Sequence, residues 1–322
     1  RTRNFLNITF HNYIDMTLDW KHKTDIIAIS KKIKDYSTDR TQRRPLNFLM
    51  IAEPGSGKSH FVKCLADKLS SSNVRAVTYN MSTFEKPEDL IHSLEIVRNL
   101  KVQDILPILF IDEFDSDENK YSFLLPLLWD GEMQLSNRNL NLGKIVIILA
   151  GSKDEIGKAI SDTKKMEEEI RNNNNSSKLK DLLSRINGGD FEIPKLDAVK
   201  GNRDRRVDKI CLTISLLQQR FGQDLQLVPW ALLKFISNTK FRYGVRSIAQ
   251  LIDLIPFSAD CLKKITAEDL KLPLKSTTSL KGSSLPYHLL TNDAEEIVER
   301  WNKAIMHKTL VRFVEDFDDD PI

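Results

Sequence analysis

The sequence has few cysteines, and the three that it has, Cys64, Cys211 and Cys261, are odd in number and far apart. This usage is typical of buried, reduced thiols and argues against a disulfide-bonded secreted fold. No apolar run reaches the roughly 20 residues that cross a bilayer, and no signal peptide is visible, so we expect no membrane partner. These absences together predict a cytoplasmic protein.

The net charge is also small, +3 over 322 residues, and by itself does not indicate nucleic acid or an anionic membrane. Basic clusters at residues 43–44 and 203–206 leave contact with nucleic acid open, but no interleaved aromatic residues support it. The six histidines lack the spacing of metal ligands, so we predict no zinc site. With 41% apolar and 29% charged residues, the composition is that of a globular protein with about two domains.

A glycine-rich segment is the most informative feature of the chain. An apolar run over residues 48–51 leads into Ala52-Glu53-Pro54-Gly55-Ser56-Gly57-Lys58-Ser59, and a predicted helix follows over residues 60–69. Strand, glycine-rich loop and helix in this order are the context of a phosphate-binding P-loop. Glycines let backbone N–H groups converge on an anion at the helix N-terminus. The residues expected to bind the nucleotide are Pro54, Gly55, Ser56, Gly57, Lys58, Ser59 and His60.

Two residues of this loop have expected chemical roles. Lys58 would reach the β- and γ-phosphates of ATP, and the Ser59 hydroxyl would be a ligand of Mg²⁺. The usual pattern opens with glycine, whereas this chain has Ala52. Because alanine adds only one methyl group, we expect the loop to keep its shape. The alternative is a glycine-rich turn that carries a solvated lysine.

A second apolar run, over residues 107–111, ends in the carboxylates Asp112 and Glu113. Such a run is typical of a strand buried on both faces of a parallel sheet. Carboxylates at its C-terminal end lie where open α/β sheets bind ligands. Asp112 would hold the hydrated Mg²⁺, and Glu113 would be the general base that activates the attacking water. Taken alone, this segment is explained equally well as a core strand followed by an acidic helix cap. Together with the P-loop, it favours nucleotide binding.

The rest of the chain divides into a mixed α/β part and a helical part. Further strands are predicted at residues 74–79, 144–150 and 191–194. The other elements of the first part are helices at 25–36, 87–99, 121–129, 153–170 and 178–186, a polar hairpin or loop at 131–143 and a polar tract at 172–177. From about residue 205 only helices are predicted, at 207–220, 230–239 and 245–255.

This change of composition predicts five segments. They are an unassigned N-terminal extension (1–20), an α/β core (21–198), a helical domain (199–274), a linker rich in Ser, Thr, Lys and Gly (275–290), and a C-terminal helix with an acidic tail (291–322). The chain starts at Arg1 rather than Met, which leaves open that it is a fragment and that an effector domain or partner protein lies outside it.

The order of these parts resembles the AAA+ ATPases over about residues 21–272. The resemblance implies an α/β fold, a three-layer P-loop NTPase core with parallel strand order 5-1-4-3-2, and a small all-helical lid domain. Residues 124–152 are also similar to Clp-like members of the family. The loop after the second strand lacks a clear pore motif, so Phe84 is either a pore residue or, in the reading we favour, one that packs locally.

The resemblance also implies roles for residues outside the two motifs. Ser152 stands where the family has its sensor 1 residue, and Arg185 where it has an arginine finger that acts in trans. Arg246 stands where the family has sensor 2, which implies a contact with the γ-phosphate. Arg185 is alternatively a solvated cation at a helix end, and Arg246 a residue that helps a helix start. Asn80 stands at the place of a polar switch residue, and residues 21–23 fall where the family contacts adenine with backbone groups.

What the resemblance implies about function is a Mg²⁺-dependent ATPase that forms a ring or filament with active sites between subunits. ATP would then drive assembly of the protein or remodelling of a partner. Two other uses stay open: a motor or loader associated with DNA or RNA, and a signalling or phage-defence scaffold with slow turnover. The lack of a clear pore motif favours the scaffold, which would act as a nucleotide-controlled switch.

Overall fold

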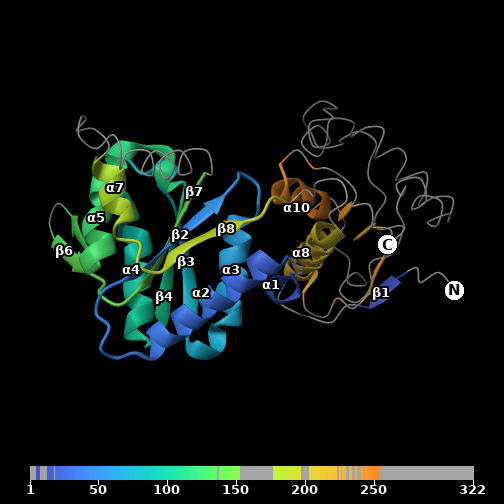
Figure 1. Ribbon diagram of the computed structural model, residues 1–322, viewed down its shortest axis with the longest axis horizontal. Helices are drawn as coiled ribbons and strands as arrows, with labels where there is room; N and C mark the ends of the chain where they lie inside the picture. The colour runs from blue at the N-terminus through green and yellow to red at the C-terminus, as the bar shows by residue number, and fades with distance from the viewer. Residues whose placement is uncertain are drawn as a thin grey trace. The chain divides into compact units, whose positions relative to one another are not determined.

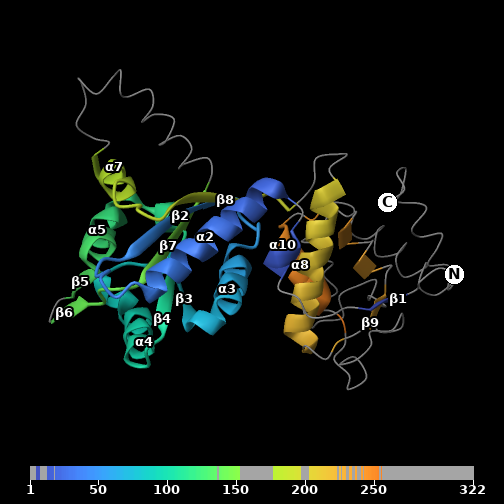
Figure 2. The same ribbon diagram turned by 60° about the horizontal axis from the view of Figure 1, so that its bottom comes forward.

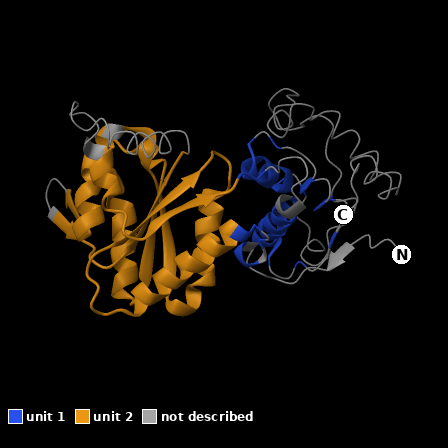
Figure 3. Cartoon of the chain, viewed as in Figure 1, with its two compact units in different colours: residues 1–20, 195–322 blue, residues 21–194 orange. Residues whose placement is uncertain are grey.

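The computed structural model describes residues 5–7, 13–17, 19–135, 138–152, 177–196, 203–222, 225, 227–229, 232–233, 236–237, 241, 243–253 and 255. The chain forms two compact units (Figure 3). Unit 2 spans residues 21–194, and unit 1 combines residues 1–20 with residues 195–322. Unit 2 contains both motifs that the sequence singles out.

Unit 2 is built on a five-stranded sheet (Figure 1). In spatial order its strands are β3 (Val74–Asn80), β4 (Leu106–Asp112), β7 (Val146–Gly151), β2 (Leu46–Ala52) and β8 (Gly189–Ile193). All four neighbouring pairs are parallel, which confirms the predicted α/β class. Numbered within this sheet and read from β8, the order is 5-1-4-3-2. It becomes 7-1-6-3-2 when the hairpin strands β5 (Glu132–Leu135) and β6 (Arg138–Asn141), which the predicted order does not count, are included.

The central strands are apolar along almost their whole length because helices cover both faces of the sheet. Every residue of β7 is buried, and so are the five inner residues of β4. Only the last residue of β4, Asp112, is both polar and partly exposed. Strands β3 and β4 therefore end in the polar side chains Asn80 and Asp112 at the carboxyl edge of the sheet, where ligands bind in open α/β folds.

The two faces carry different helices (Figure 2). On one face, Phe61 of α3 (Lys58–Lys68) and His22 of α2 (Trp20–Thr38) pack in a chain of rings that continues to Phe191 and Phe48 of the sheet. Helix α3 connects β2 to β3, and α4 (Ile91–Val102) connects β3 back to β4, so the two connections cross the sheet in opposite directions. Because such parallel crossovers are right-handed, the two helices lie on opposite faces.

The other face contains an extensive apolar cluster. It joins Leu49, Leu109 and Leu149 of the strands to α4, α5 (Tyr121–Asp130) and α7 (Ser177–Leu183). Successive strand residues point to opposite faces, so Phe48 and Leu49 belong to different layers. Phe84 is 2% exposed in this cluster and packs against Phe123, so the structure favours local packing over a pore role.

Several element boundaries differ from the predicted ones. Helix α2 begins at Trp20 rather than residue 25, because its first turn shows no apolar period: Trp20 is exposed and the buried residue is His22. Residues Pro87–Leu90 form a 3-10 turn before α4. Helix α7 ends at Leu183, which leaves Arg185 in the following turn rather than inside a helix. Gly131 and Gly143 enclose the predicted hairpin, which the structure shows as β5 and β6.

Unit 1 contains α1 (Tyr13–Met16), α8 (Arg203–Phe221), α10 (Val245–Asp253) and two short strands, β1 (Phe5–Asn7) and β9 (Leu227–Pro229), which pair antiparallel. Because β9 lies within residues 199–274, the prediction that this segment is all-helical is wrong. A three-residue strand is too short to show alternation in the sequence, and Pro229 is tolerated at the end of such an edge pair.

Some predicted elements lie outside the described residues. They are the helix at 153–170, nearly all of the polar tract at 172–177, parts of the helix at 230–239, Cys261, the linker at 275–290 and the C-terminal helix and tail at 291–322. The other two cysteines, Cys64 and Cys211, are both buried thiols. Burial and the nearby Asp208 carboxylate raise the pKa of the Cys211 thiol to about 11, so this thiol stays protonated at neutral pH.

Candidate active site at the carboxyl edge of the sheet

The loop between β2 and α3 has a backbone shape that glycine adopts most readily. Gly55 and Gly57 have φ angles of 78° and 92°, in the left-handed region. The Ser56 N–H donates to the Glu53 carbonyl at 3.2 Å and closes a turn. Ala52 is the last residue of β2 and is 2% exposed. Its methyl group belongs to a buried strand end, so the loop tolerates alanine in the place of the usual glycine.

The start of α3 is suited to an anion. Gly57 is its N-cap, and no side chain among the described residues caps the helix. The first N–H groups of a helix favour a bound anion, and the helix dipole adds to this preference. The hydroxyl oxygen of Ser56 is buried and has no hydrogen-bond partner in the described part of the chain. A phosphate group in the loop would provide a partner both for the first N–H groups of α3 and for the Ser56 hydroxyl, so these residues fit a nucleotide.

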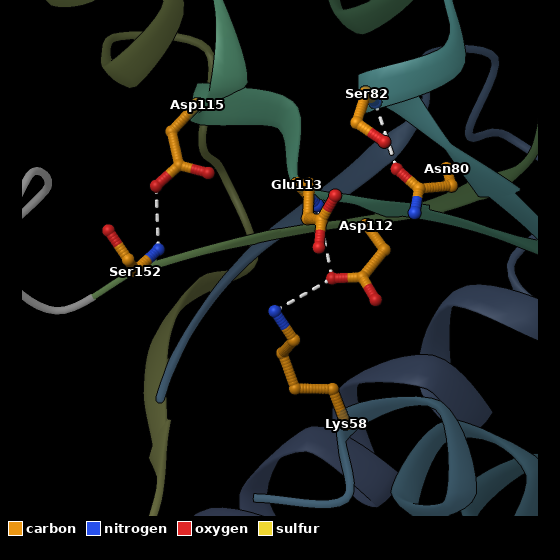
Figure 4. A network of polar contacts seen from close by, with 7 residues as sticks. All are labelled: Lys58, Asn80, Ser82, Asp112, Glu113, Asp115 and Ser152. Atoms are coloured by element: carbon orange, nitrogen blue, oxygen red, sulfur yellow. Dashed lines mark hydrogen bonds and ion pairs between the residues drawn. The ribbon is translucent and has the colours of Figure 1, made fainter. Parts of the chain in front are cut away.

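The two motifs meet in an ion pair. The Lys58 Nζ lies 2.8 Å from the Asp112 Oδ1, with the two side chains only 12% and 14% exposed (Figure 4). Lys58 comes from the first turn of α3 and Asp112 from the end of β4. A lysine held this way is a positive charge directly beside the glycine loop, and it also offsets the desolvation of the carboxylate.

The residues that would hold Mg²⁺ also fit that ion. Asp112 offers a carboxylate, and Ser59 is exposed on the first turn of α3. Within the described residues, no group of three or more His, Cys, Asp or Glu side chains forms a metal cage. Mg²⁺ is commonly bound by one or two protein oxygens, with waters and phosphate oxygens completing its octahedron. Such a donor set needs no cage, and it differs from the sites that zinc prefers.

Three strands place their ends side by side. Asn80 of β3 pairs in register with Asp112, and Asp112 pairs with Ala150 of β7. Asn80, Asp112 and Ser152, two residues beyond Ala150, therefore lie along one edge. The Asn80 Oδ1 accepts the Ser82 N–H at 2.9 Å and caps a short turn. This is a structural role for Asn80, and its action as a switch stays a prediction.

Glu113 has an unusual backbone. Its φ and ψ of 55° and 38° are left-handed, a conformation that costs a non-glycine residue roughly 1–3 kcal/mol. Its N–H donates to the Oδ1 of Asp112 at 3.0 Å. Strain of this kind persists where the surrounding structure requires it, and here it turns the chain sharply after β4. The result is that two adjacent carboxylates, Asp112 and Glu113, are both in the site (Figure 4).

Asp115 also lies in the site, although the sequence predicted no role for it. Its Oδ2 accepts the backbone N–H of Ser152 at 2.6 Å, so the loop after β4 and the end of β7 are tied together. In Figure 4 the Ser152 hydroxyl is turned away from Lys58 and Asp112. A carboxylate three residues after Asp112 was the available signal, but its partner is 37 residues away in sequence.

We expect Asp115→Ala to lower kcat for ATP hydrolysis about 10-fold, because a hydrogen bond to a charged acceptor is lost and the Ser152 segment is no longer fixed. Asp115→Asn keeps an oxygen acceptor, so it should stay within about threefold of wild type. Steady-state phosphate release with varied ATP measures both. Equal kcat for the alanine variant and wild type would show that the Asp115 contact has no catalytic consequence.

Arg185 does not lie at this edge. Its carbonyl accepts the Asn47 Nδ2 at 2.9 Å, and Asn47 is the second residue of β2. Five residues of extended chain, about 16 Å at about 3.3 Å per residue, separate Asn47 from Ala52 at the other end of the strand. The Arg185 guanidinium is paired with the Asp181 carboxylate instead. Arg185 therefore cannot contact a phosphate in the P-loop of its own subunit.

Arg246 lies in the first turn of α10 in unit 1, where it is exposed, and its N–H donates to the Tyr243 carbonyl at 3.2 Å. Its predicted contact with the γ-phosphate, like the predicted adenine contact of residues 21–23, stays a prediction. His60 is partly exposed on the first turn of α3, with its Nε2 3.6 Å from the Cys64 Sγ. Pro54 is exposed in the loop.

Residues 48–174 match the model of the family described as "ATPase family associated with various cellular activities (AAA)". Residues 48–174 therefore carry an AAA domain. The matched segment contains the P-loop, the Asp112–Glu113 pair and Ser152, whereas Arg185 and Arg246 lie beyond it. Among the helices that the structure describes, none combines the length and the apolar character needed to cross a membrane.

No curated protein matches the chain. Among solved structures it is similar to NtrX from Brucella abortus in complex with ATP, with 16% identity and a TM-score of 0.46 over 97% of this chain and 66% of that one. The corresponding values for NtrX in complex with ADP are 16%, 0.45, 92% and 66%. For the S. cerevisiae Hsp104–ADP complex they are 13%, 0.45, 79% and 44%. The chain thus spans just under two thirds of NtrX and less than half of Hsp104.

Proposed function

We propose that this AAA+ module binds ATP with Mg²⁺ and hydrolyses it. The observation that supports this most strongly is the Lys58–Asp112 ion pair at the base of a glycine loop, with Glu113 beside it. A turn that merely carried a solvated lysine would not bury that lysine against a carboxylate. The helix start without a side-chain cap and the buried Ser56 hydroxyl add the same preference for an anion.

In this proposal each side chain has a task. Lys58 exchanges its contact with Asp112 for the β- and γ-phosphates when ATP enters the loop. Asp112 and the Ser59 hydroxyl are then available to the metal ion. When bound there, Mg²⁺ would offset negative charge on the phosphate groups. Glu113 orients a water molecule for attack in line with the leaving oxygen and accepts its proton.

The position of Arg185 supports an active site shared between subunits. The site contains a base and a lysine but no arginine from unit 2 that neutralises charge on the transferring phosphoryl group, at least in the described part of that unit. Arg185, at the opposite end of β2, would supply this charge to a second copy of the chain. A head-to-tail contact of this kind is heterologous, so copies would continue into a closed ring or an open filament.

In this proposal, the cycle of ATP binding and hydrolysis controls the assembly of several copies of the chain, and the assembly acts on a partner or effector. Phe84, the aromatic residue of the loop after β3, is buried against Phe123 and is therefore not exposed for contact with a threaded substrate. This observation favours a switch over a motor that threads its client. A motor would predict turnover that rises with its substrate, whereas a switch predicts slow turnover and assembly that follows the bound nucleotide.

We expect ATP with Mg²⁺ to stabilise wild type and not Lys58→Ala. At 100 times its Kd, a ligand stabilises the folded state by about 2.7 kcal/mol, which raises Tm by several degrees for a domain of this size. Thermal unfolding with and without ATP measures the shift. Lys63→Ala is the matched control, because Lys63 is an exposed lysine of the same helix. An undiminished shift in Lys58→Ala, or a loss of the shift in Lys63→Ala as well, would contradict the assignment.

A further inference from the structure

The guanidinium of Arg185 is held in a defined environment of its own subunit. The side chain is 20% exposed and pairs with the Asp181 carboxylate. Its Nη1 also donates to the Asp181 carbonyl at 2.8 Å, and its Cζ lies 6.0 Å from the centre of the Trp129 ring. The buried Nε has no hydrogen-bond partner among the described residues. A solvated cation at a helix end would not be this enclosed.

Trp129, in the last turn of α5, is 45% exposed although it is the largest kind of side chain. Arg44 lies over the same ring, with its Cζ 4.2 Å from the ring centre. Tryptophan offers the strongest cation–π attraction of the aromatic residues. Arg44 and Arg185 are 141 positions apart in sequence, so this arrangement exists only in the folded chain.

One buried side chain sets the spacing between Trp129 and Arg185. Asn47 is 0% exposed, and its Nδ2 donates both to the Leu128 carbonyl at 2.7 Å and to the Arg185 carbonyl at 2.9 Å. Asn187 strengthens the same junction, because its Oδ1 accepts the Asn47 N–H at 2.7 Å. The backbones that carry the indole and the guanidinium are therefore fixed to the start of β2. Only the guanidinium itself remains to be oriented.

We propose that Trp129 is a positioning residue that orients Arg185 toward the phosphates bound by a second copy of the chain, an inference that rests on the proposed in-trans function. Asp181 and Trp129 differ in what they do to the guanidinium. The carboxylate neutralises its charge and must release it before it can offset phosphoryl charge. The indole is neutral, so it restricts the direction of Arg185 and leaves its full charge available.

A mixed-subunit assay tests this inference. Glu113→Gln supplies an intact Arg185 but cannot hydrolyse ATP, and Arg185→Ala supplies an intact base but no guanidinium. Each is expected to be nearly inactive alone, and their mixture to regain turnover at the shared interfaces. Adding Trp129→Leu to the Glu113→Gln chain only should lower kcat of the mixture about 2- to 5-fold, the factor expected for one exposed cation–π contact. KM for ATP should not change, because the hydrolysing chain is unaltered.

Two further variants of the Glu113→Gln chain separate positioning from structure. Trp129→Phe keeps an aromatic face and should restore most of the lost kcat. Phe123→Leu removes another exposed aromatic residue of α5 and should leave the mixture unchanged. Unaltered kcat with Trp129→Leu, a fall that Trp129→Phe does not reverse, or an effect on KM instead would each overturn the role of Trp129. If the mixture without any Trp129 substitution regains no turnover, the in-trans function itself fails.

Discussion

Glu113→Gln is expected to bind ATP as wild type does and to hydrolyse it about 10²–10⁴-fold more slowly, the range for the loss of a general base. Glutamine is nearly isosteric, so the left-handed turn at Glu113 and the Lys58–Asp112 pair beneath it remain. The binding half of the site is therefore intact, and only the group that accepts the proton is lost. Single-turnover phosphate release at saturating ATP measures the chemical step, and ATP-dependent thermal stabilisation measures binding.

The matched control for Glu113→Gln is Glu85→Gln, which changes an exposed glutamate outside the site by the same atoms. It should leave both measurements unchanged. If Glu113→Gln hydrolysed ATP at the wild-type rate, the water would be activated by another group, and Asp115, the carboxylate of the same loop that contacts Ser152, would be the first candidate. If Glu113→Gln lost binding instead, its effect would be on the fold of the loop rather than on catalysis.

Arg185→Ala is expected to bind ATP normally and to lose about 10³-fold or more in kcat, as removal of an arginine finger does. Its own P-loop is unaffected, because Arg185 lies at the opposite end of β2. Arg185→Lys keeps the charge but not the planar, forked donor set, so it should recover only a small part of the loss. Steady-state kinetics at protein concentrations above and below the assembly threshold measure both variants.

A turnover of Arg185→Ala equal to that of wild type would refute the in-trans role. A loss of ATP binding in this variant would instead indicate that the substitution disturbs the hydrogen bonds at Asn47. The fall in kcat should also depend on assembly. Below the assembly threshold, wild type and Arg185→Ala should be equally slow, because no partner subunit is present to supply the arginine.

The sequence was sufficient to predict the parallel sheet and the two motifs. Local patterns carry that information: a buried strand of a parallel sheet is a short continuous apolar run, and Gly55 and Gly57 stand where the backbone must be left-handed. The carboxylates Asp112 and Glu113 follow such a run directly. Because each of these signals is contained in fewer than ten residues, no knowledge of tertiary contacts was needed.

Features that depend on long-range contacts could not be predicted in this way. The Asp115–Ser152 hydrogen bond and the Arg44–Trp129 stacking join residues that are far apart in sequence. Without the structure, the basic pair at residues 43–44 had no aromatic neighbour. The pairing of β1 with β9 joins segments more than 200 residues apart, each only three residues long, so neither has a periodicity that a sequence pattern could detect.

The measurement that tests the central claim most directly is mass by light scattering, with phosphate release followed on the same samples. Wild type and Glu113→Gln are compared with ATP and Mg²⁺ and without nucleotide. An ATP-dependent, shared active site predicts that ATP raises the mass of both proteins, that the assembly of Glu113→Gln persists, and that only wild type releases phosphate. A protein that remains monomeric with ATP and releases no phosphate would contradict the account, and Arg185 would then lose its assigned role.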